Sequence, residues 1–360
     1  MKIVFIYGGQ GSQVEGMGRD LYESYPFVQD FYDSIQLDFP LKELAFQGDL
    51  ETISKTEYTQ GILLAFQISA TKVLAEYGIR PNIAMGLSLG EYAALYAADS
   101  LDDTTLLKII EFRSRQMAKA AQALDSKMLA VFSDDLEGLE ELCKVHSKRE
   151  ARVEVSNINT KGQIVLSGDA QVIKKIGEAL KSQGYKFKEL NTSGPFHTSY
   201  MDPVEKSLMN LFQTIEFKTP QIPIIHNLYG RLQENIHGQD SDLQNPEHEE
   251  LDNQEQDNQE QGNQEQDNQE QDNQEQNKRE KDKQEKQPRF DLKETMAKQV
   301  NHPVLFKSSL EELLEQKPDL ILEIGYSNVI KGLMKRIDKS VKVISINTVE
   351  SIEEFVQLLK

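Results

Sequence analysis

Short apolar runs alternate with longer amphipathic segments along most of this 360-residue chain, and this alternation constrains its fold more than any other feature. The apolar runs have the length and composition of buried strands and lie at 3–7, 82–86, 319–325 and 341–347. Helical patterns occupy 17–35, 60–77, 89–98, 103–123 and 328–337. Strands and helices that alternate in this way form a parallel sheet with helices packed on it. The sequence therefore predicts an α/β fold.

A different order of elements occupies the middle of the chain. The strand-like segments there are 128–133, 152–158, 163–168 and 185–190, and the helical patterns are 134–147 and 170–183. The order β-α-β-β-α-β is that of the split, ferredoxin-like motif. The sequence therefore predicts a small ferredoxin-like subdomain at 126–191, inserted into a large catalytic domain made of 1–125 and 192–360. A ligand is expected in the crevice between the two.

The large domain is itself interrupted at 233–289 by a low-complexity tract. The unit D/G-N-Q-E-Q repeats five times from Asp252 to Gln276. The tract holds 18 acidic and 6 basic residues, so it carries more than half of the net charge of −19. Because it has few apolar residues to bury, we expect a disordered, solvated expansion of a surface loop rather than a domain. The acidic balance argues against a nucleic-acid partner.

The composition also bears on location and metal chemistry. No apolar run approaches the length of a membrane span, and the opening run "MKIVFIYGG" is too short for the hydrophobic region of a signal peptide. The single cysteine, Cys143, lies in a helical pattern and can form neither a disulfide framework nor a thiolate metal site. We expect a cytoplasmic protein with Cys143 in its core, no bound metal and no membrane attachment.

The segment "IAMGLSLGEYAAL" places Ser88 between two glycines, where an apolar run gives way to a helical one. It matches G-x-S-x-G, in which a sharp strand-to-helix turn pushes the serine oxygen out of the backbone. The N–H groups at the start of the helix then face any negative charge that develops nearby. Such a short pattern also occurs by chance. Ser88 is therefore a candidate nucleophile that needs a base.

Six histidines could supply that base. His237 and His248 lie in the low-complexity tract and His146 in a charged helix, whereas His226 follows a predicted strand and His302 precedes a proline. His197 lies in "NTSGPFHTSYM", a turn-rich loop that follows the inserted subdomain. This position at the mouth of the expected crevice makes His197 the candidate base. The alternative is a hydrogen-bonded structural histidine.

Two further features could contribute to a site. The loop "YGGQGSQ" fails the dinucleotide pattern G-x-G-x-x-G, since Val14 stands at the third glycine, but its glycines leave backbone N–H groups free to point into a site. Arg113 lies on the mainly apolar helix 103–123, where an arginine must find an anion or reach solvent. The alternative for Arg113 is a surface ion pair with Glu111 or a neighbour.

Taken together, these motifs resemble the malonyl-coenzyme A:acyl carrier protein transacylases of fatty-acid synthesis and the related acyltransferase domains of polyketide synthases. The resemblance covers nearly all of the chain outside the tract and implies an α/β-hydrolase-like parallel-sheet domain with an inserted ferredoxin-like βαββαβ subdomain. The matching segments, in chain order, are "GGQGSQVEGMG", "GLSLGEY", "EFRSRQM", "SGPFHTSYM", "KQVNHPVLF" and "EIGYSNVIKGLMKRI".

The resemblance also implies a role for each matching residue. Ser88 would be the nucleophile that accepts the acyl group, and His197 its general acid and base. The backbone N–H groups of Gln10 and Leu89 would form the oxyanion hole. Gln299 would orient His197 through a carbonyl oxygen, which accounts for the lack of an obvious aspartate.

Two more residues bear on the substrate. Arg113 would bind the free carboxylate of a malonyl group through a two-pronged, charge-assisted hydrogen bond. Phe196, next to the histidine, would crowd the α-carbon and disfavour methylmalonyl; the alternative is that Phe196 only packs the loop. The resemblance implies no metal and no redox cofactor, with malonyl-CoA and acyl carrier protein as the partners of a monomer.

The sequence departs from the family pattern at four positions. Leu87 stands where the family has histidine, Gly9 where it has proline before the first loop glutamine, and Gly61 and Tyr326 replace two further prolines. None of these departures removes a reacting group. Together they put the rate and the acyl selectivity in question.

These observations predict a ping-pong acyltransferase that moves a malonyl group from malonyl-CoA to acyl carrier protein. The first alternative is a stand-alone transacylase for a polyketide assembly line, which the sequence does not distinguish from one for fatty-acid synthesis. The second is an acyl hydrolase, against which Arg113 argues because a simple acyl chain has no carboxylate. The third is a non-catalytic binding protein, against which the complete set of candidate site residues argues.

Overall fold

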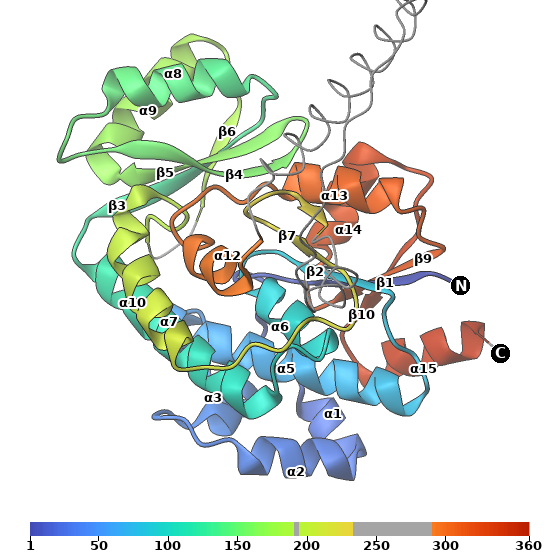
Figure 1. Ribbon diagram of the computed structural model, residues 1–360. Helices are drawn as coiled ribbons and strands as arrows, with labels where there is room; N and C mark the ends of the chain where they lie inside the picture. Colours follow the sequence, from blue (N-terminus) through green and yellow to red (C-terminus); the bar gives the residue numbers. More distant parts are fainter. Residues whose placement is uncertain (191–193, 233–289, 360) are drawn as a thin grey trace, which may run out of the picture. The chain divides into compact units, whose positions relative to one another are not determined.

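The computed structural model describes residues 1–190, 194–232 and 290–359 (Figure 1). The predicted low-complexity tract at 233–289, with His237 and His248, lies outside the described residues. Met1–Glu234 and Leu292–Lys360 form one compact unit, and the fold given below is that of this unit.

The first of two sheets is six-stranded and almost entirely parallel. Its strands are β1 (Ile3–Tyr7), β2 (Ile83–Gly86), β7 (Ile224–His226), β8 (Arg231–Leu232), β9 (Leu320–Ile324) and β10 (Val343–Ile346). Their order is β10-β9-β1-β2-β7-β8, and only the short edge strand β8 runs antiparallel to its neighbour. The predicted strands at 3–7, 82–86, 319–325 and 341–347 are all present. Their carboxyl ends share one edge of the sheet, where ligands bind in open α/β folds.

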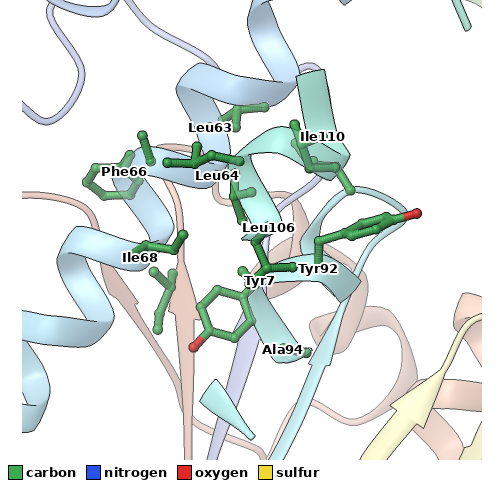
Figure 2. Close-up of a cluster of buried hydrophobic side chains, with 14 of the residues drawn as sticks. Tyr7, Leu63, Leu64, Phe66, Ile68, Tyr92, Ala94, Leu106 and Ile110 are labelled. Carbon is green, nitrogen blue, oxygen red and sulfur yellow. The ribbon is translucent and has the colours of Figure 1, made fainter. Parts of the chain in front are cut away.

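Successive residues of a strand point to opposite sides of the sheet, so a strand that is apolar throughout gives both faces apolar side chains. Helices cover both faces. Phe5 and Tyr7 of β1 pack against α5 (Thr56–Glu76), α6 (Gly90–Ala97) and α7 (Asp103–Gln122). Val4 and Ile6 pack against α13 (Phe306–Glu315) and α14 (Val329–Ile337). Figure 2 shows part of the first of these cores, to which Tyr7 of β1, Leu63, Leu64, Phe66 and Ile68 of α5, Tyr92 and Ala94 of α6, and Leu106 and Ile110 of α7 all contribute.

The second sheet is antiparallel and follows the β-α-β-β-α-β order that the sequence predicts. Its elements are β3 (Ser126–Val131), α8 (Leu136–His146), β4 (Val153–Thr160), β5 (Gln163–Asp169), α9 (Ala170–Ser182) and β6 (Phe187–Leu190). The strand order β4-β5-β3-β6 is that of a ferredoxin-like sheet, and α8 and α9 cover one of its faces (Figure 1). Cys143 is buried in this core, as predicted, and burial raises the pKa of its thiol to about 12.

The remaining helices show where local patterns were insufficient. The single helix predicted at 17–35 is wrong: α1 (Arg19–Ser24) and α2 (Pro26–Ser34) are separated at Tyr25, whose backbone is extended because it precedes a proline. Several helices were not assigned from the sequence, namely α3 (Leu41–Gln47), α4 (Leu50–Ile53), α10 (Asp202–Gln213), α12 (Leu292–Lys298) and α15 (Val349–Leu358), together with the short 3₁₀ helix at Ser199–Met201. Within the described ranges, none of the helices combines the length and apolar character needed to cross a membrane.

Candidate active site

Ser88 occupies a sharp turn between β2 and α6. Its backbone adopts φ 52°, in the left-handed region that non-glycine residues rarely enter. The two flanking glycines are required by close approach. A Cβ atom on Gly86 would lie 2.0 Å from the carbonyl carbon of Gly90, and one on Gly90 would lie 2.3 Å from the Tyr7 carbonyl oxygen. The chain can therefore pass from strand to helix in this space only with glycine at both positions.

Asn227, a residue that the sequence analysis did not identify, holds this turn in place. The Ser88 N–H donates to Asn227 Oδ1 at 2.6 Å, and Asn227 Nδ2 donates to the Gly86 carbonyl oxygen at 2.6 Å. Asn227 directly follows β7, which pairs with β2 in the sheet. A polar residue at the carboxyl end of an apolar strand was the only signal in the sequence.

His197 contacts the serine directly. The Ser88 hydroxyl lies 2.8 Å from His197 Nε2, and His197 Nδ1 lies 2.8 Å from the backbone carbonyl oxygen of Gln299. A carbonyl oxygen only accepts, so Nδ1 carries the ring hydrogen and Nε2 accepts from the serine hydroxyl. The backbone at His197 is also held, at φ 60°, by a 2.9 Å hydrogen bond from its N–H to the Val300 carbonyl oxygen.

The surroundings of His197 favour its neutral form. The side chain is buried, and burial together with the nearby Arg113 guanidinium lowers the pKa of His197 to about 4. The histidine is therefore an uncharged base at neutral pH. Two other histidines have different partners: His226 Nδ1 bonds to Glu91, and His302 Nδ1 bonds to the Lys298 carbonyl oxygen. His146 lies at the end of α8 in the ferredoxin-like part of the fold.

Two backbone N–H groups beside Ser88 are available to a ligand. Leu89 begins the turn of α6, and Gln10 lies in the glycine-rich loop that follows β1, the strand next to β2. Neither the Gln10 nor the Leu89 N–H donates a hydrogen bond to any residue that the structure describes. Both residues line the cavity that contains Ser88.

Arg113 is fully buried on α7, and its guanidinium group points toward Ser88. Its Nη1 donates to Gln60 Oε1 at 2.6 Å, and its Nη2 lies 2.9 Å from Gln299 Oε1 and 3.4 Å from Ser88 Oγ. The guanidinium carbon lies 5.3 Å from the centre of the Tyr92 ring. Burial lowers the pKa of Arg113 from its ordinary value. All of its hydrogen-bond partners are uncharged.

The surface ion pair considered for Arg113 is therefore not formed. Glu111 instead lies 3.2 Å from Arg115, which is exposed on the same helix. No carboxylate of the described residues forms an ion pair with Arg113, and its Nε has no hydrogen-bond acceptor among them. A buried cation without a counter-charge in contact is costly unless an anionic ligand completes the site.

These groups surround a cavity of about 370 Å³. One side is formed by residues at the carboxyl edge of the parallel sheet and by Phe196 and His197. The other is formed by residues of the ferredoxin-like sheet, including Met128, Asn157 and Val165. Phe196 is buried and lines the cavity next to the histidine. In the described part of the chain, no cluster of three or more His, Cys, Asp or Glu residues could hold a metal ion.

Of the four departures from the family pattern, Leu87 and Gly9 line the cavity, whereas Gly61 and Tyr326 do not. A Cβ atom on Gly9 would lie 2.6 Å from the Leu87 carbonyl oxygen, so the glycine lets the loop after β1 approach the serine turn. A Cβ atom on Gly61 would lie 3.0 Å from the Phe39 ring. The Tyr326 hydroxyl accepts a 3.1 Å hydrogen bond from the Gly18 N–H. The polar side-chain contacts of Ser88 are made instead by Asn227, His197, Arg113 and Gln299.

A serine in a strained strand-to-helix turn, hydrogen-bonded to a neutral histidine and close to free N–H groups, has the geometry of nucleophilic acyl transfer. On an α/β sheet with a ferredoxin-like insertion, this geometry defines a class of serine-dependent acyltransferases. The chain belongs to the acyl transferase domain family, whose model matches residues 4–261.

Individual relatives are similar over nearly the whole chain. The malonyl CoA-acyl carrier protein transacylase of Staphylococcus aureus strain MRSA252 is 31% identical, covering 98% of this chain and 97% of that protein. The crystal structure of MCAT from Streptococcus pneumoniae is 28% identical with a TM-score of 0.78, covering 99% of this chain and 100% of the other. A malonyl-transacylase in complex with its type II PKS acyl-carrier protein is 25% identical, with a TM-score of 0.79 and the same coverage.

Proposed function

We propose that this protein transfers a malonyl group from malonyl-CoA to the phosphopantetheine thiol of acyl carrier protein in fatty-acid biosynthesis, through a malonyl ester of Ser88. The observation that carries this proposal is Arg113, a buried guanidinium with uncharged partners 3.4 Å from the Ser88 hydroxyl. Such a cation suits an acyl group that ends in a carboxylate. The names of the similar proteins describe the same reaction.

In the first half-reaction, Ser88 Oγ attacks the thioester carbonyl carbon while His197 Nε2 takes the hydroxyl proton. The oxyanion that forms is bound by the N–H groups of Gln10 and Leu89, and one such donor contributes roughly 3–4 kcal/mol to the transition state. The carbon–sulfur bond then breaks and His197 returns the proton to the departing coenzyme A thiolate. Malonyl-Ser88 is left with its carboxylate on Arg113.

In the second half-reaction, the thiol of the carrier protein gives its proton to His197 Nε2 and attacks the ester carbonyl carbon. The same two N–H groups bind the oxyanion. The bond to Ser88 Oγ breaks, and the serine takes the proton back from His197. Throughout both steps the Gln299 backbone carbonyl accepts from Nδ1, so the imidazolium that forms transiently is oriented and stabilised.

A polyketide assembly line is a second candidate destination for the malonyl group, favoured by the similarity to a malonyl-transacylase bound to a type II PKS carrier protein. The same site chemistry serves both pathways. A cytoplasmic location and a monomeric state stay predictions of the sequence.

Incubation with malonyl-CoA followed by intact-protein mass spectrometry tests the proposal. We expect the mass to rise by one malonyl group, located on the Ser88 peptide, and to return to its starting value when holo-acyl carrier protein is added. Loss of the malonyl group to water at the same rate without carrier protein would instead identify an acyl hydrolase.

The pH dependence of acylation tests the state of His197. The reaction needs the neutral imidazole, and the pKa of about 4 lies below the ordinary value of 6.5, so the active form is lost only as the pH falls through about 4. We expect the acylation rate constant to stay level between roughly pH 8 and pH 6 and to fall tenfold per pH unit on the acid side. Acetyl-CoA has no free carboxyl group, so a fall in its acylation rate at low pH can come only from the enzyme. We expect the acid side of the pH profile to be the same for both substrates. A midpoint near pH 6.5 with both substrates would contradict the assignment.

Phe196 is expected to limit the size of the α-substituent. Phe196→Ala should raise the preference for methylmalonyl-CoA relative to malonyl-CoA by about tenfold, because removing the buried ring enlarges the cavity beside His197. Phe132→Ala, which removes an exposed phenylalanine, is the control. If Phe196→Ala lowers the activity with malonyl-CoA and with methylmalonyl-CoA equally, the ring only packs the loop.

A further inference from the structure

The reaction steps described above leave one buried carboxylate beside Ser88 unused. Glu91 lies in the first turn of α6, three residues after Ser88, and its side chain is fully buried. Its Oε1 is 2.6 Å from His226 Nδ1 and 3.3 Å from the Asn227 N–H, and its Oε2 accepts from Gln299 Nε2 at 2.5 Å. No lysine or arginine in the described ranges forms an ion pair with Glu91. Burying a carboxylate costs free energy, so its presence here indicates a role for Glu91 beyond packing.

The Gln299 side chain connects Glu91 to Arg113. Gln299 Nε2 donates to Glu91 Oε2 and, at 2.8 Å, to the Ser88 carbonyl oxygen, whereas Gln299 Oε1 accepts from Arg113 Nη2 at 2.9 Å. A carboxylate can only accept hydrogen bonds and a guanidinium can only donate them. The amide therefore has a single allowed orientation, with its nitrogen toward Glu91 and its oxygen toward Arg113.

Glu91 is also a counter-charge for Arg113 without touching it. Burial lowers the pKa of Arg113, while interactions with the neighbouring Tyr92 and with Glu91 oppose that shift. A direct ion pair would occupy the guanidinium donors that a substrate carboxylate needs. With one amide between the two charges, Arg113 stays charged and its face toward Ser88 stays open to a ligand.

We propose that Glu91, held by His226, is a positioning residue for malonyl recognition, because it orients the Gln299 amide that holds Arg113 beside Ser88. This inference rests on the proposed function. Glu91 does not touch the reacting atoms, so its effect should appear in the recognition of the substrate carboxylate rather than in acyl transfer as such.

The variant Glu91→Gln tests this role with almost no change in shape. His226 Nδ1 and the Asn227 N–H would keep an oxygen of the new amide toward themselves, which turns its NH₂ group toward the Gln299 NH₂ group. Gln299 must then rotate and present a donor to Arg113, which is also a donor. Arg113 should leave its position.

The measurement is the single-turnover acylation of Ser88 by malonyl-CoA and by acetyl-CoA, each over a range of concentrations. For Glu91→Gln we expect kcat/KM of the half-reaction with malonyl-CoA to fall by about tenfold or more, chiefly through a higher half-saturating concentration. The kcat/KM with acetyl-CoA, which has no carboxylate, should change by less than about threefold. The ratio of the two substrates is therefore the readout.

Glu323→Gln is the matched control. Glu323 is equally buried, on β9, and accepts from the Ile330 and Lys331 N–H groups at the start of α14. This variant should lower the melting temperature without altering the malonyl-to-acetyl ratio. If Glu91→Gln does not fold, His226→Leu removes one donor to Glu91 and should shift the same ratio in the same direction by about threefold.

The outcomes separate the two proposals. If wild-type protein forms no malonyl-Ser88, the proposed function fails. If wild type does so and Glu91→Gln (or its substitute His226→Leu) leaves the ratio unchanged, whether both substrates are slowed equally or neither is, Glu91 is only structural and the inference is overturned.

Discussion

Ser88→Ala is expected to abolish the malonyl-enzyme and to lower malonyl transfer to acyl carrier protein by roughly 10⁴- to 10⁶-fold, the range seen when a catalytic nucleophile is removed. The hydroxyl 2.8 Å from His197 Nε2 is the atom on which the acyl group would be carried, and alanine has no atom to replace it. The fold should persist, because Ser88 lies in a turn and its backbone N–H keeps the hydrogen bond to Asn227. Intact-protein mass spectrometry and the rate of malonyl-carrier formation measure the two effects.

Ser327→Ala provides the control for Ser88→Ala. Ser327 lines the same cavity, but its hydroxyl lies 3.4 Å from Glu323 and contacts no candidate reacting group. Its loss should change the transfer rate by less than about threefold. If Ser88→Ala still gains a malonyl group at the wild-type rate, another residue is the nucleophile and the mechanism is wrong.

Arg113→Ala is expected to lower malonyl transfer strongly and to leave acetyl transfer unchanged or faster. Hydrogen bonds to charged groups contribute about 1.5–3 kcal/mol each, so loss of a two-pronged pair should lower kcat/KM for malonyl-CoA by roughly 10²- to 10⁴-fold. Acetyl-CoA has no carboxylate that could contact Arg113, so the acylation rate with acetyl-CoA should stay the same or rise. Arg113→Lys should recover only part of the malonyl activity, because an ammonium group cannot form the two-pronged contact. Acylation rates with both substrates provide the measurement.

The control for this experiment lies two residues further along α7. Arg115 is exposed and pairs with Asp38 and Glu111, so Arg115→Ala should leave the ratio of malonyl to acetyl transfer unchanged. Equal loss of both activities in Arg113→Ala, together with a large drop in melting temperature, would mean that the arginine only supports the packing around Gln60 and Gln299.

Local patterns predicted those features that depend on near neighbours in the chain. The strand at 3–7 was found from a short, continuous apolar run and the helix at 103–123 from its helical pattern, because a strand buried on both faces is apolar throughout and a helix repeats its buried face every 3.6 residues. The serine turn was found from its glycines, since only glycine allows the backbone contacts at Gly86 and Gly90. Where a local rule was overlooked, at Tyr25 before a proline, one predicted helix proved to be two.

The candidate site was predictable only as a set of separate motifs. Local motifs made Ser88, His197 and Arg113 candidates and the resemblance to a family implied their roles, but no pattern in the sequence shows that these side chains meet. The serine and the histidine are 109 positions apart in the chain, and Gln299 is 211 positions from Ser88. Their distances depend on how the strands are ordered in the sheet, which is a property of packing between distant segments.

The sequence by itself thus determined the α/β class, the ferredoxin-like order of the insertion and the chemical groups available for catalysis, because these follow from short-range sterics, periodicity and residue type. Only the tertiary structure decided which nitrogen of His197 faces Ser88, that Asn227 holds the turn, and that Glu91 reaches Arg113 through an amide. Each of these depends on a donor meeting an acceptor across the buried interior. There an unpaired polar group is costly, so the packing of distant elements selects one arrangement.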